Sequence, residues 1–514
     1  MKTSLILDGH TLDLDTFVEV ARHKRKITLS ETALERVNES FATVGRIVES
    51  GVPTYGISTG FGELSRVTIK PEENETLQLN LIRSHASAVG EPLAEAEVRG
   101  MMLLRLNTML KGFSGVNPAI CRLLTELLNR NIVPYIPEKG SLGASGDLAN
   151  LAHMALVLIG EGEAFVEGKK VAGIDALSKA GLSPVRLSGK DGLALINGTQ
   201  LITSIGALAL FDAFRLYETA AGSLSLTLEA LRGITAAFLP EVHELRPHPG
   251  QIDTAALVLA LVAGSDLTNS RPGDVQDAYS LRCAPQVHGA VLDALNTCRL
   301  AIEIEMNAVN DNPLVLRDGR ILSGGHFHGE PLALPLDYAA IAVAELANIA
   351  ERRIERMVNP QLSGLPAFLT PQSGLNSGYM IPQYVAAALV SENKVLAHPA
   401  SVDSIPSSAN KEDHVSMGSH AARKFSAIVK NAAYVLAIEL MVAAQAIDLG
   451  KHTDEKLGRA TNALYDLIRT HIPTLGDDRM PAGDIEALKV LTLDGAFARI
   501  VSDVREKTNE DQHR

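Results

Sequence analysis

The sequence is poor in the residues that build disulfide frameworks and metal clusters. Its 514 residues include only three cysteines, Cys121, Cys283 and Cys298, and their spacing matches no zinc site. Tryptophan is absent and aromatic residues make up 4% of the chain. The low cysteine count excludes a disulfide-stapled secreted scaffold and favours a reducing, cytoplasmic location.

The sequence also lacks a targeting segment, a membrane-length apolar run and an excess of basic residues. The apolar run before Asp8 is three residues long, which is too short for a signal peptide. The longest apolar stretch, residues 255–264, is about half the length that a transmembrane helix needs. Asp and Glu outnumber Lys and Arg by 60 to 47, whereas phosphate binding requires a basic surface. We therefore expect no membrane and no nucleic-acid partner.

Long, apolar, alanine-rich helices are the main feature that is present. Residues 338–359 carry apolar side chains every three or four positions and are followed by Pro360, a helix terminator. Residues 285–308 and 419–449 have the same character. Helices this apolar must be covered on most sides, by one another or by partner subunits. The pattern predicts a mainly α protein with a central helix bundle that forms a homo-oligomer.

The N-terminal part has a more mixed pattern. A short strand, an Asp-Gly turn and predicted helices over residues 32–50 and 94–111 are separated by Gly- and Pro-rich loops. Three consecutive regions of one interlocked fold are expected. They are a mixed N-terminal region over residues 1–200, a long-helix bundle over 201–450 and a C-terminal helical region over 451–514.

The stretch EKGSLGASGDLANLAHM, residues 138–154, places a glycine-rich loop before a predicted helix with Asp147 at its N-cap. If the nitrogen of Gly146 attacks the carbonyl of Ala144, a five-membered ring closes, and the missing Cβ at 146 permits the bend. Loss of water from the ring and from Ser145 then leaves a methylidene group conjugated to a carbonyl. Such an electrophile gains from a helix N-terminus, which stabilises developing negative charge. Taken alone, the tripeptide is more typical of an ordinary glycine-rich turn than of such an electrophile.

Six further blocks decide between these interpretations. They are YGISTGFG (55–62), GLALINGTQ (192–200), RPHPGQ (246–251), VQDAYSLRCAPQVHG (275–289), MNAVNDNPL (306–314) and SVDSIPSSANKEDHVSMG (401–418). With the Ala-Ser-Gly loop, they resemble the aromatic amino acid lyase family in the expected order, from about residue 5 to 480. The similarity is greatest to the members that act on histidine.

The resemblance implies a fold, an assembly and a prosthetic group. The fold is the mainly α, aspartase/fumarase-like one with a long central helix bundle, in a homotetramer whose active sites are shared between subunits. The group is 4-methylideneimidazol-5-one (MIO), formed autocatalytically from Ala144, Ser145 and Gly146, with no metal or diffusible cofactor. The implied reaction is deamination of the small-molecule substrate L-histidine to trans-urocanate and ammonia, in histidine degradation.

Catalytic roles carry over by position. Deamination must remove a weakly acidic β-proton, and Tyr55 matches the family's base. A tyrosine acting near neutral pH needs its pKa lowered by a nearby positive charge or helix end. Asn197 and Tyr279 match residues that support the prosthetic group and substrate, and Gln276 lies in the same block as Tyr279. Arg282 matches the substrate carboxylate clamp, because a guanidinium fork fits two carboxylate oxygens; a structural ion pair is the alternative for this arginine.

The side-chain pocket implied by the resemblance contains His85, Phe327, Met380 and Glu412. A carboxylate at position 412 suits a ring that donates an N–H, whereas a phenylalanine side chain would leave that charge unpaired. A solvated helix-end charge is the alternative for Glu412. The weaker determinant is His85, because Ser-His also occurs at this place in some tyrosine aminomutases.

Three departures from the family pattern keep the substrate open. Ser58 and His326 stand where Asn is usual, and Asn150 stands where Pro is usual. We therefore keep as alternatives a tyrosine or phenylalanine ammonia-lyase or aminomutase, and a lyase of a modified histidine. Two alternatives come from other classes: a metal-dependent amidohydrolase using His326 and His328 on a strand, and a non-enzymatic protein with the lyase fold.

Overall fold

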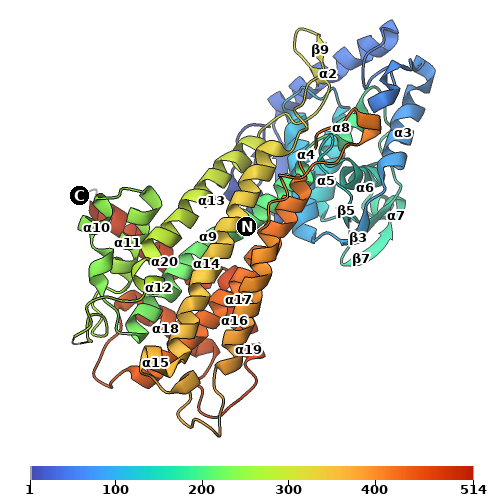
Figure 1. The fold of residues 1–514 in the computed structure, drawn as a ribbon. Coiled ribbons are helices and arrows are strands. Elements are labelled where there is room, and N and C mark those ends of the chain that lie inside the picture. Colours follow the sequence, from blue (N-terminus) through green and yellow to red (C-terminus); the bar gives the residue numbers. More distant parts are fainter. Residues whose placement is uncertain (1–2, 272, 513–514) are drawn as a thin grey trace. The chain divides into compact units, whose positions relative to one another are not determined.

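The computed structural model describes residues 3–271 and 273–512, with side chains through residue 507. The chain divides into two compact units, each built from three separate segments (Figure 1). Unit 1 contains Met1–Phe211, Cys298–Asp337 and Pro399–Arg423, and unit 2 contains Asp212–Thr297, Tyr338–His398 and Lys424–Arg514. This division differs from the three consecutive regions expected from the sequence, because most unit boundaries fall inside long helices.

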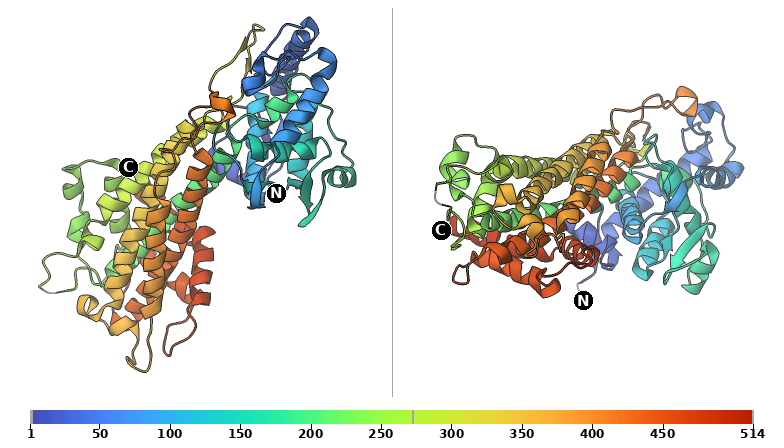
Figure 2. Two further views of the ribbon diagram at one scale, coloured as in Figure 1. Left: turned by 45° about the vertical axis from the view of Figure 1, so that its right-hand side comes forward. Right: turned by 60° about the horizontal axis from the view of Figure 1, so that its bottom comes forward.

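The long helices predicted from the sequence are confirmed. They are α13 (Ala284–Met306), α14 (Glu330–Val358) and α17 (Gly418–Gly450), and the structure adds a fourth long helix, α9 (Gln200–Ala230). Helix α14 begins before the predicted start at residue 338 and contains Pro335. In unit 2 the four helices run side by side, and their facing alanine and leucine side chains are buried (Figures 1 and 2).

Unit 2 surrounds this bundle with shorter helices. They are α10 (Pro240–Glu244), α11 (Pro249–Leu261), α12 (Tyr279–Arg282), α15 (Pro360–Ser363), α16 (Met380–Leu396), α18 (Arg459–His471), α19 (Ala482–Leu493) and α20 (Ala496–Gln512). Helix α20 packs against α11, α18 and α19.

Unit 1 contains eight helices ahead of α9. They are α1 (Leu14–Ala21), α2 (Glu31–Ser50), α3 (Asn74–His85), α4 (Glu95–Leu110), α5 (Pro118–Arg130), α6 (Leu148–Leu158), α7 (Gly173–Lys179) and α8 (Asp191–Ile196). Helix α4 packs against α1 and α5, and every residue from Val98 to Leu110 is buried. This helix therefore forms the core on which the surrounding loops are placed.

The strands of unit 1 are short and form small separate sheets. They are β1 (Leu5–Leu7) parallel to β2 (Ile27–Leu29), β3 (Val89–Pro92) antiparallel to β5 (Pro137–Lys139), the order β4 (Val133–Pro134), β6 (Glu163–Val166), β7 (Lys169–Ala172), and β8 (Leu314–Val315) paired with β9 (Ile321–Leu322). Strand β5 leads into the loop of residues 140–147.

Two helices, α14 and α17, are long and apolar enough to cross a membrane by length and composition alone. However, 61% and 78% of their most apolar windows are buried inside the protein. Core helices of a bundle have the same properties, so the two helices are weak grounds for a membrane span.

Candidate active site

The loop Ala144-Ser145-Gly146 is held in a tight left-handed turn. Ser145 has φ +52° and Gly146 has φ +75°, a region that strongly favours glycine. A Cβ on Gly146 would lie 2.1 Å from the carbonyl oxygen of Gly198, so no larger residue fits there. The small residues and the bend are those that ring closure between residues 144 and 146 requires. The loop therefore fits the prosthetic group that the sequence implies.

Asp147 follows this loop and has a different partner from the one predicted. It occupies the N-cap position of α6, but its side chain caps no N–H of that helix. Its carboxylate instead accepts the N–H groups of Leu201 (2.8 Å) and Ile202 (3.1 Å) at the start of α9, and the hydroxyl of Ser141 (2.7 Å). Burial raises the pKa of Asp147 to about 7, against the effect of these hydrogen bonds. Asp147 therefore ties the loop to α9, a partner that local sequence could not reveal.

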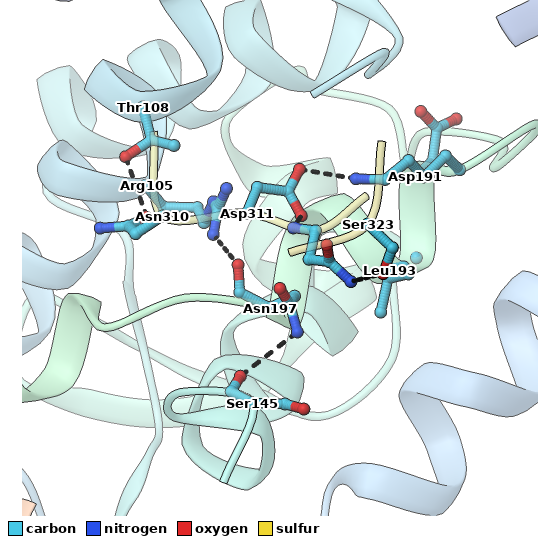
Figure 3. Close-up of polar contacts among 12 residues, drawn as sticks. Arg105, Thr108, Ser145, Asp191, Leu193, Asn197, Asn310, Asp311 and Ser323 are labelled. Atoms are coloured by element: carbon cyan, nitrogen blue, oxygen red, sulfur yellow. Dashed lines mark hydrogen bonds and ion pairs between the residues drawn. The ribbon is translucent and has the colours of Figure 1, made fainter. Parts of the chain in front are cut away.

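Asn197 approaches the same loop from the segment between α8 and α9. Its side-chain Nδ2 donates to the carbonyl oxygen of Ser145 at 3.3 Å. Its own backbone carbonyl accepts a hydrogen bond from Nη1 of Arg105 at 2.5 Å (Figure 3). The next carbonyl, that of Gly198, accepts the N–H of Asp147 at 2.7 Å. The structure thus places Asn197 beside Ser145, as predicted, and adds Arg105, which the sequence analysis missed.

Glu412 contacts the same loop, and His85 lies near Glu412. The Ser145 hydroxyl donates to Oε1 of Glu412 at 3.0 Å, and the Ser407 hydroxyl donates to Oε2 at 2.9 Å. Burial lowers the pKa of His85, while a hydrogen bond to the Leu81 backbone and the nearby charge of Glu412 act in the opposite direction. A lowered pKa keeps the His85 imidazole neutral at neutral pH. Glu412 is therefore a half-buried group facing the loop and not a solvated helix-end charge.

Tyr55 lies in a neighbouring loop of unit 1. Its hydroxyl accepts the N–H of Gly62 at 3.4 Å, and its side chain lines a pocket of about 500 Å³ together with Pro313 and Ile321. The Tyr55 loop touches the segment that precedes Glu412, because Glu63 pairs with Lys411 at 3.7 Å. The loop that carries Tyr55 thus adjoins the segment that carries Glu412.

Phe327 occupies a half-buried position in the turn that leads into α14. The adjacent His328 ring stacks on His414 with centroids 5.7 Å apart, so this turn also adjoins the segment of Glu412. Residues 326–328 form a turn and not the strand that a metal-binding pair would require. The described residues contain no group of three or more His, Cys, Asp or Glu side chains arranged to hold a metal ion.

The remaining predicted residues lie in unit 2. Gln276 is exposed, and the Tyr279 side chain is 71% exposed. The Arg282 guanidinium carbon lies 4.7 Å from the centre of the Tyr279 ring, and its buried Nε has no hydrogen-bond partner among the described residues. Met380 is the half-buried first residue of α16. The structure therefore brings Tyr279 and Arg282 into contact within unit 2.

The three departures from the family pattern have different surroundings. The Ser58 hydroxyl donates to the Val52 carbonyl at 2.8 Å and accepts the Thr54 N–H at 2.9 Å, so it closes its own loop. Asn150 is buried and donates to the Pro137 carbonyl at 2.7 Å, which joins α6 to β5. His326 is exposed and lies near the half-buried carboxylate of Glu305 in unit 1.

Comparison with known proteins gives a consistent result. Residues 12–470 match the aromatic amino acid lyase family. The chain is 59% identical to a histidine ammonia-lyase of Treponema denticola over 489 residues, which cover 95% of this chain and 96% of that one. The chain belongs to the aromatic amino acid lyase family. This family is MIO-dependent, which agrees with the Ala-Ser-Gly turn.

Two solved structures extend the comparison. A tyrosine aminomutase of Streptomyces globisporus superposes with a TM-score of 0.93 at 40% identity, covering 98% of this chain and 99% of that one. A histidine ammonia-lyase of Trypanosoma cruzi superposes with a TM-score of 0.91 at 42% identity, covering 98% and 96%. These matches confirm the fold predicted from the sequence.

Proposed function

We propose that this chain is an ammonia-lyase that deaminates L-histidine to trans-urocanate and ammonia through MIO formed from Ala144, Ser145 and Gly146. The observation that carries the proposal is the Glu412 carboxylate, 3.0 Å from the Ser145 hydroxyl and near a neutral His85. A carboxylate at this place accepts the N–H of an imidazole ring. It would be left unpaired by a phenyl side chain.

The side chains of the site divide the chemistry among them. MIO supplies an electrophile that withdraws electrons from the substrate amine and makes it a better leaving group. Tyr55 takes the β-proton, and Arg282 binds the substrate carboxylate with its guanidinium fork. Asn197 donates to the Ser145 carbonyl and so stabilises negative charge that develops on that oxygen. Glu412 accepts the imidazole N–H, and His85 orients the other side of the ring.

The same proposal includes a homotetramer with active sites shared between subunits. Supporting it, Tyr279 is 71% exposed in the single chain although its predicted role is in the site. The apolar helices α13 and α14 also expose Leu300, Ile304, Leu334 and Ile341. Light scattering should report about four times the chain mass of 54.8 kDa. The three free cysteines support a cytoplasmic location.

Product identification tests the reaction. Purified protein incubated separately with histidine, tyrosine and phenylalanine should release urocanate from histidine far faster than the corresponding acids from the other two. The similarity to a tyrosine aminomutase makes an aminomutase the second candidate, and its signature is a β-amino acid product. A β-tyrosine product, or no urocanate, would overturn the proposal.

A further inference from the structure

Arg105 is a fully buried arginine whose hydrogen bonds are incomplete. It lies in α4 and is 0% exposed. Its Nη1 donates to the backbone carbonyl of Asn197 at 2.5 Å and to Oε1 of Gln200 at 3.2 Å. Its Nε and Nη2 are buried and have no hydrogen-bond partner among the described residues. Burying a cation with unpartnered donors is costly, and such costs are concentrated where they serve a function.

Among the described residues, no carboxylate forms a hydrogen bond or ion pair with this guanidinium. The nearest compensating charge is Asp311, but its carboxylate is bonded to Nζ of Lys190 at 2.6 Å, and both of these side chains are also 0% exposed. The direct hydrogen bonds of Arg105 are therefore made to residues 197–200, which we call the Asn197 segment (Figure 3).

Asn197 and the following Gly198 each form a hydrogen bond with the Ser145 loop. The Asn197 side chain donates to the Ser145 carbonyl at 3.3 Å, and the carbonyl of Gly198 accepts the Asp147 N–H at 2.7 Å. Both contacts depend on the position of the Asn197–Gly198 peptide, because its carbonyl oxygen accepts the hydrogen bond from Arg105. A shift of that peptide would release the loop on both sides of Ser145.

We propose that Arg105 is a positioning residue for the self-processing of the Ala-Ser-Gly loop, an inference that rests on the proposed function. In that reaction the nitrogen of Gly146 bonds to the carbonyl carbon of Ala144. The Ala144 oxygen leaves as water with the amide hydrogens of Gly146 and Ser145. A second water takes the hydroxyl and the α-hydrogen of Ser145, so the step needs no oxidant or reductant.

The Asn197 hydrogen bond favours the second loss of water. The α-hydrogen of Ser145 is adjacent to the carbonyl that Asn197 contacts, and a donor on this oxygen stabilises the charge that develops when the hydrogen is removed. Arg105 acts through Asn197, since its own contact is with the Asn197 backbone.

The same helix supplies a matched control. Arg99 is 1% exposed and donates to the backbone carbonyls of Val20 (2.8 Å), Ala21 (3.2 Å) and Leu128 (2.9 Å), none of which belongs to the Ser145 loop. Replacing Arg99 removes a buried guanidinium from α4 without touching the Asn197 segment.

The test compares Arg105→Gln, Arg105→Lys and Arg99→Gln in the full-length chain. The readouts are the fraction of chains that have lost two waters, followed by intact mass after a short induction, and the melting temperature. Losing a charge-assisted hydrogen bond predicts about ten- to a hundred-fold slower processing in Arg105→Gln than in Arg99→Gln. Arg105→Lys should process at an intermediate rate, because lysine keeps the charge but not the fork.

Equal processing rates in Arg105→Gln and Arg99→Gln would overturn the proposal, whether both are fast or both are slow. If Arg105→Gln does not fold, Arg105→Lys decides in its place: a rate equal to that of wild type contradicts the role. Failure of the proposed function gives a different result, namely a wild-type chain that loses two waters but releases no urocanate from histidine.

Discussion

Each unit buries an arginine completely, and the two arginines are bonded in different ways. In unit 2, Arg353 binds both carboxylate oxygens of Glu439, with Nη2 at 2.9 Å from Oε2, and Ser223 donates to the same carboxylate at 2.7 Å. In unit 1, Arg105 has no carboxylate partner in the part of the chain that the structure describes, and it donates to the backbone carbonyl of Asn197. The ion pair of Arg353 and Glu439 joins helices of the bundle, whereas the Arg105 guanidinium binds the segment that contacts the Ser145 loop. Changes in unit 2 should therefore lower stability, and changes in unit 1 should alter processing and selectivity.

The largest difference in processing is expected between alanine substitutions at two glycines, Gly146 in unit 1 and Gly250 in unit 2. A Cβ on Gly146 would lie 2.1 Å from the Gly198 carbonyl oxygen, and a Cβ on Gly250 in unit 2 would lie 2.2 Å from the Gly289 carbonyl oxygen. Gly146→Ala should abolish the loss of two waters and the lyase activity, because φ +75° is also strained for alanine. Gly250→Ala should lower the melting temperature and leave the mass loss intact. Intact mass and melting curves of both variants check this, and a processed Gly146→Ala chain would contradict it.

The second contrast concerns the buried ion pair of Arg353 and Glu439. Glu439→Gln leaves Arg353 half-paired in the interior, which should cost about 3–5 kcal/mol of unfolding free energy. The control is Glu455→Gln, because Glu455 pairs with Arg232 at a place where both side chains are partly exposed to solvent, so the cost should be smaller than that of Glu439→Gln. Denaturation compares the two variants. Processing should be unchanged in both, and a Glu439→Gln chain that melts like wild type but stays unprocessed would break the comparison between the units.

Sequence patterns predicted the elements of the fold better than the partners of single side chains. The long helices follow from apolar periodicity, which is local, and the Ser145 loop follows from its tripeptide within an ordered set of blocks. The acceptor role of Asp147 at α9 could not be predicted, since Leu201 is distant in the sequence. The division of residues 201–450 between two units depends on long-range contacts for the same reason.

The role of Arg105 could be predicted from the sequence only in part. A charged residue inside the apolar run MMLLRLNTML is itself a signal, because such a residue must find a partner in the core. The signal does not say which partner. Ser58, in contrast, departs from the Asn that is usual at its place in a family motif, and the structure uses its hydroxyl within its own loop.

A third prediction addresses substrate selectivity within unit 1. Glu412→Gln should lower kcat/KM for histidine about ten- to a hundred-fold, since a hydrogen bond to a charged partner is worth roughly 1.5–3 kcal/mol, and should affect residual tyrosine or phenylalanine turnover less. The exposed neighbour Asp413 supplies the control, Asp413→Asn. If discrimination survives in Glu412→Gln and collapses in Ser58→Asn or His326→Asn, the assignment of the pocket is wrong.

The smallest expected effect is shared by both units. Burial raises the pKa of Asp191 in unit 1, and that of Glu218 in unit 2, to about 7. Between an unfolded pKa near 4 and this value, the folded state binds more protons than the unfolded state. Stability should therefore fall as the pH rises from about 4 to 7, by up to about 1.4 kcal/mol per pH unit for each group.

Substitution with the neutral isostere removes this slope. The stability of Asp191→Asn relative to wild type should improve as the pH rises from 5 to 7, and Glu218→Gln should behave in the same way. Denaturation at both pH values measures the change. A relative stability that worsens with rising pH would contradict the sign.

The central claim is that the serine at position 145 does not survive in the mature chain, and peptide mapping of the wild-type protein tests it most directly. Trypsin releases residues 140–169 as one peptide, which contains the whole loop. This peptide should be lighter than its sequence by two waters, whereas the Ser145→Ala peptide should have its full mass and that variant should release no urocanate. A wild-type peptide of unmodified mass from protein that deaminates histidine at full rate would contradict the claim.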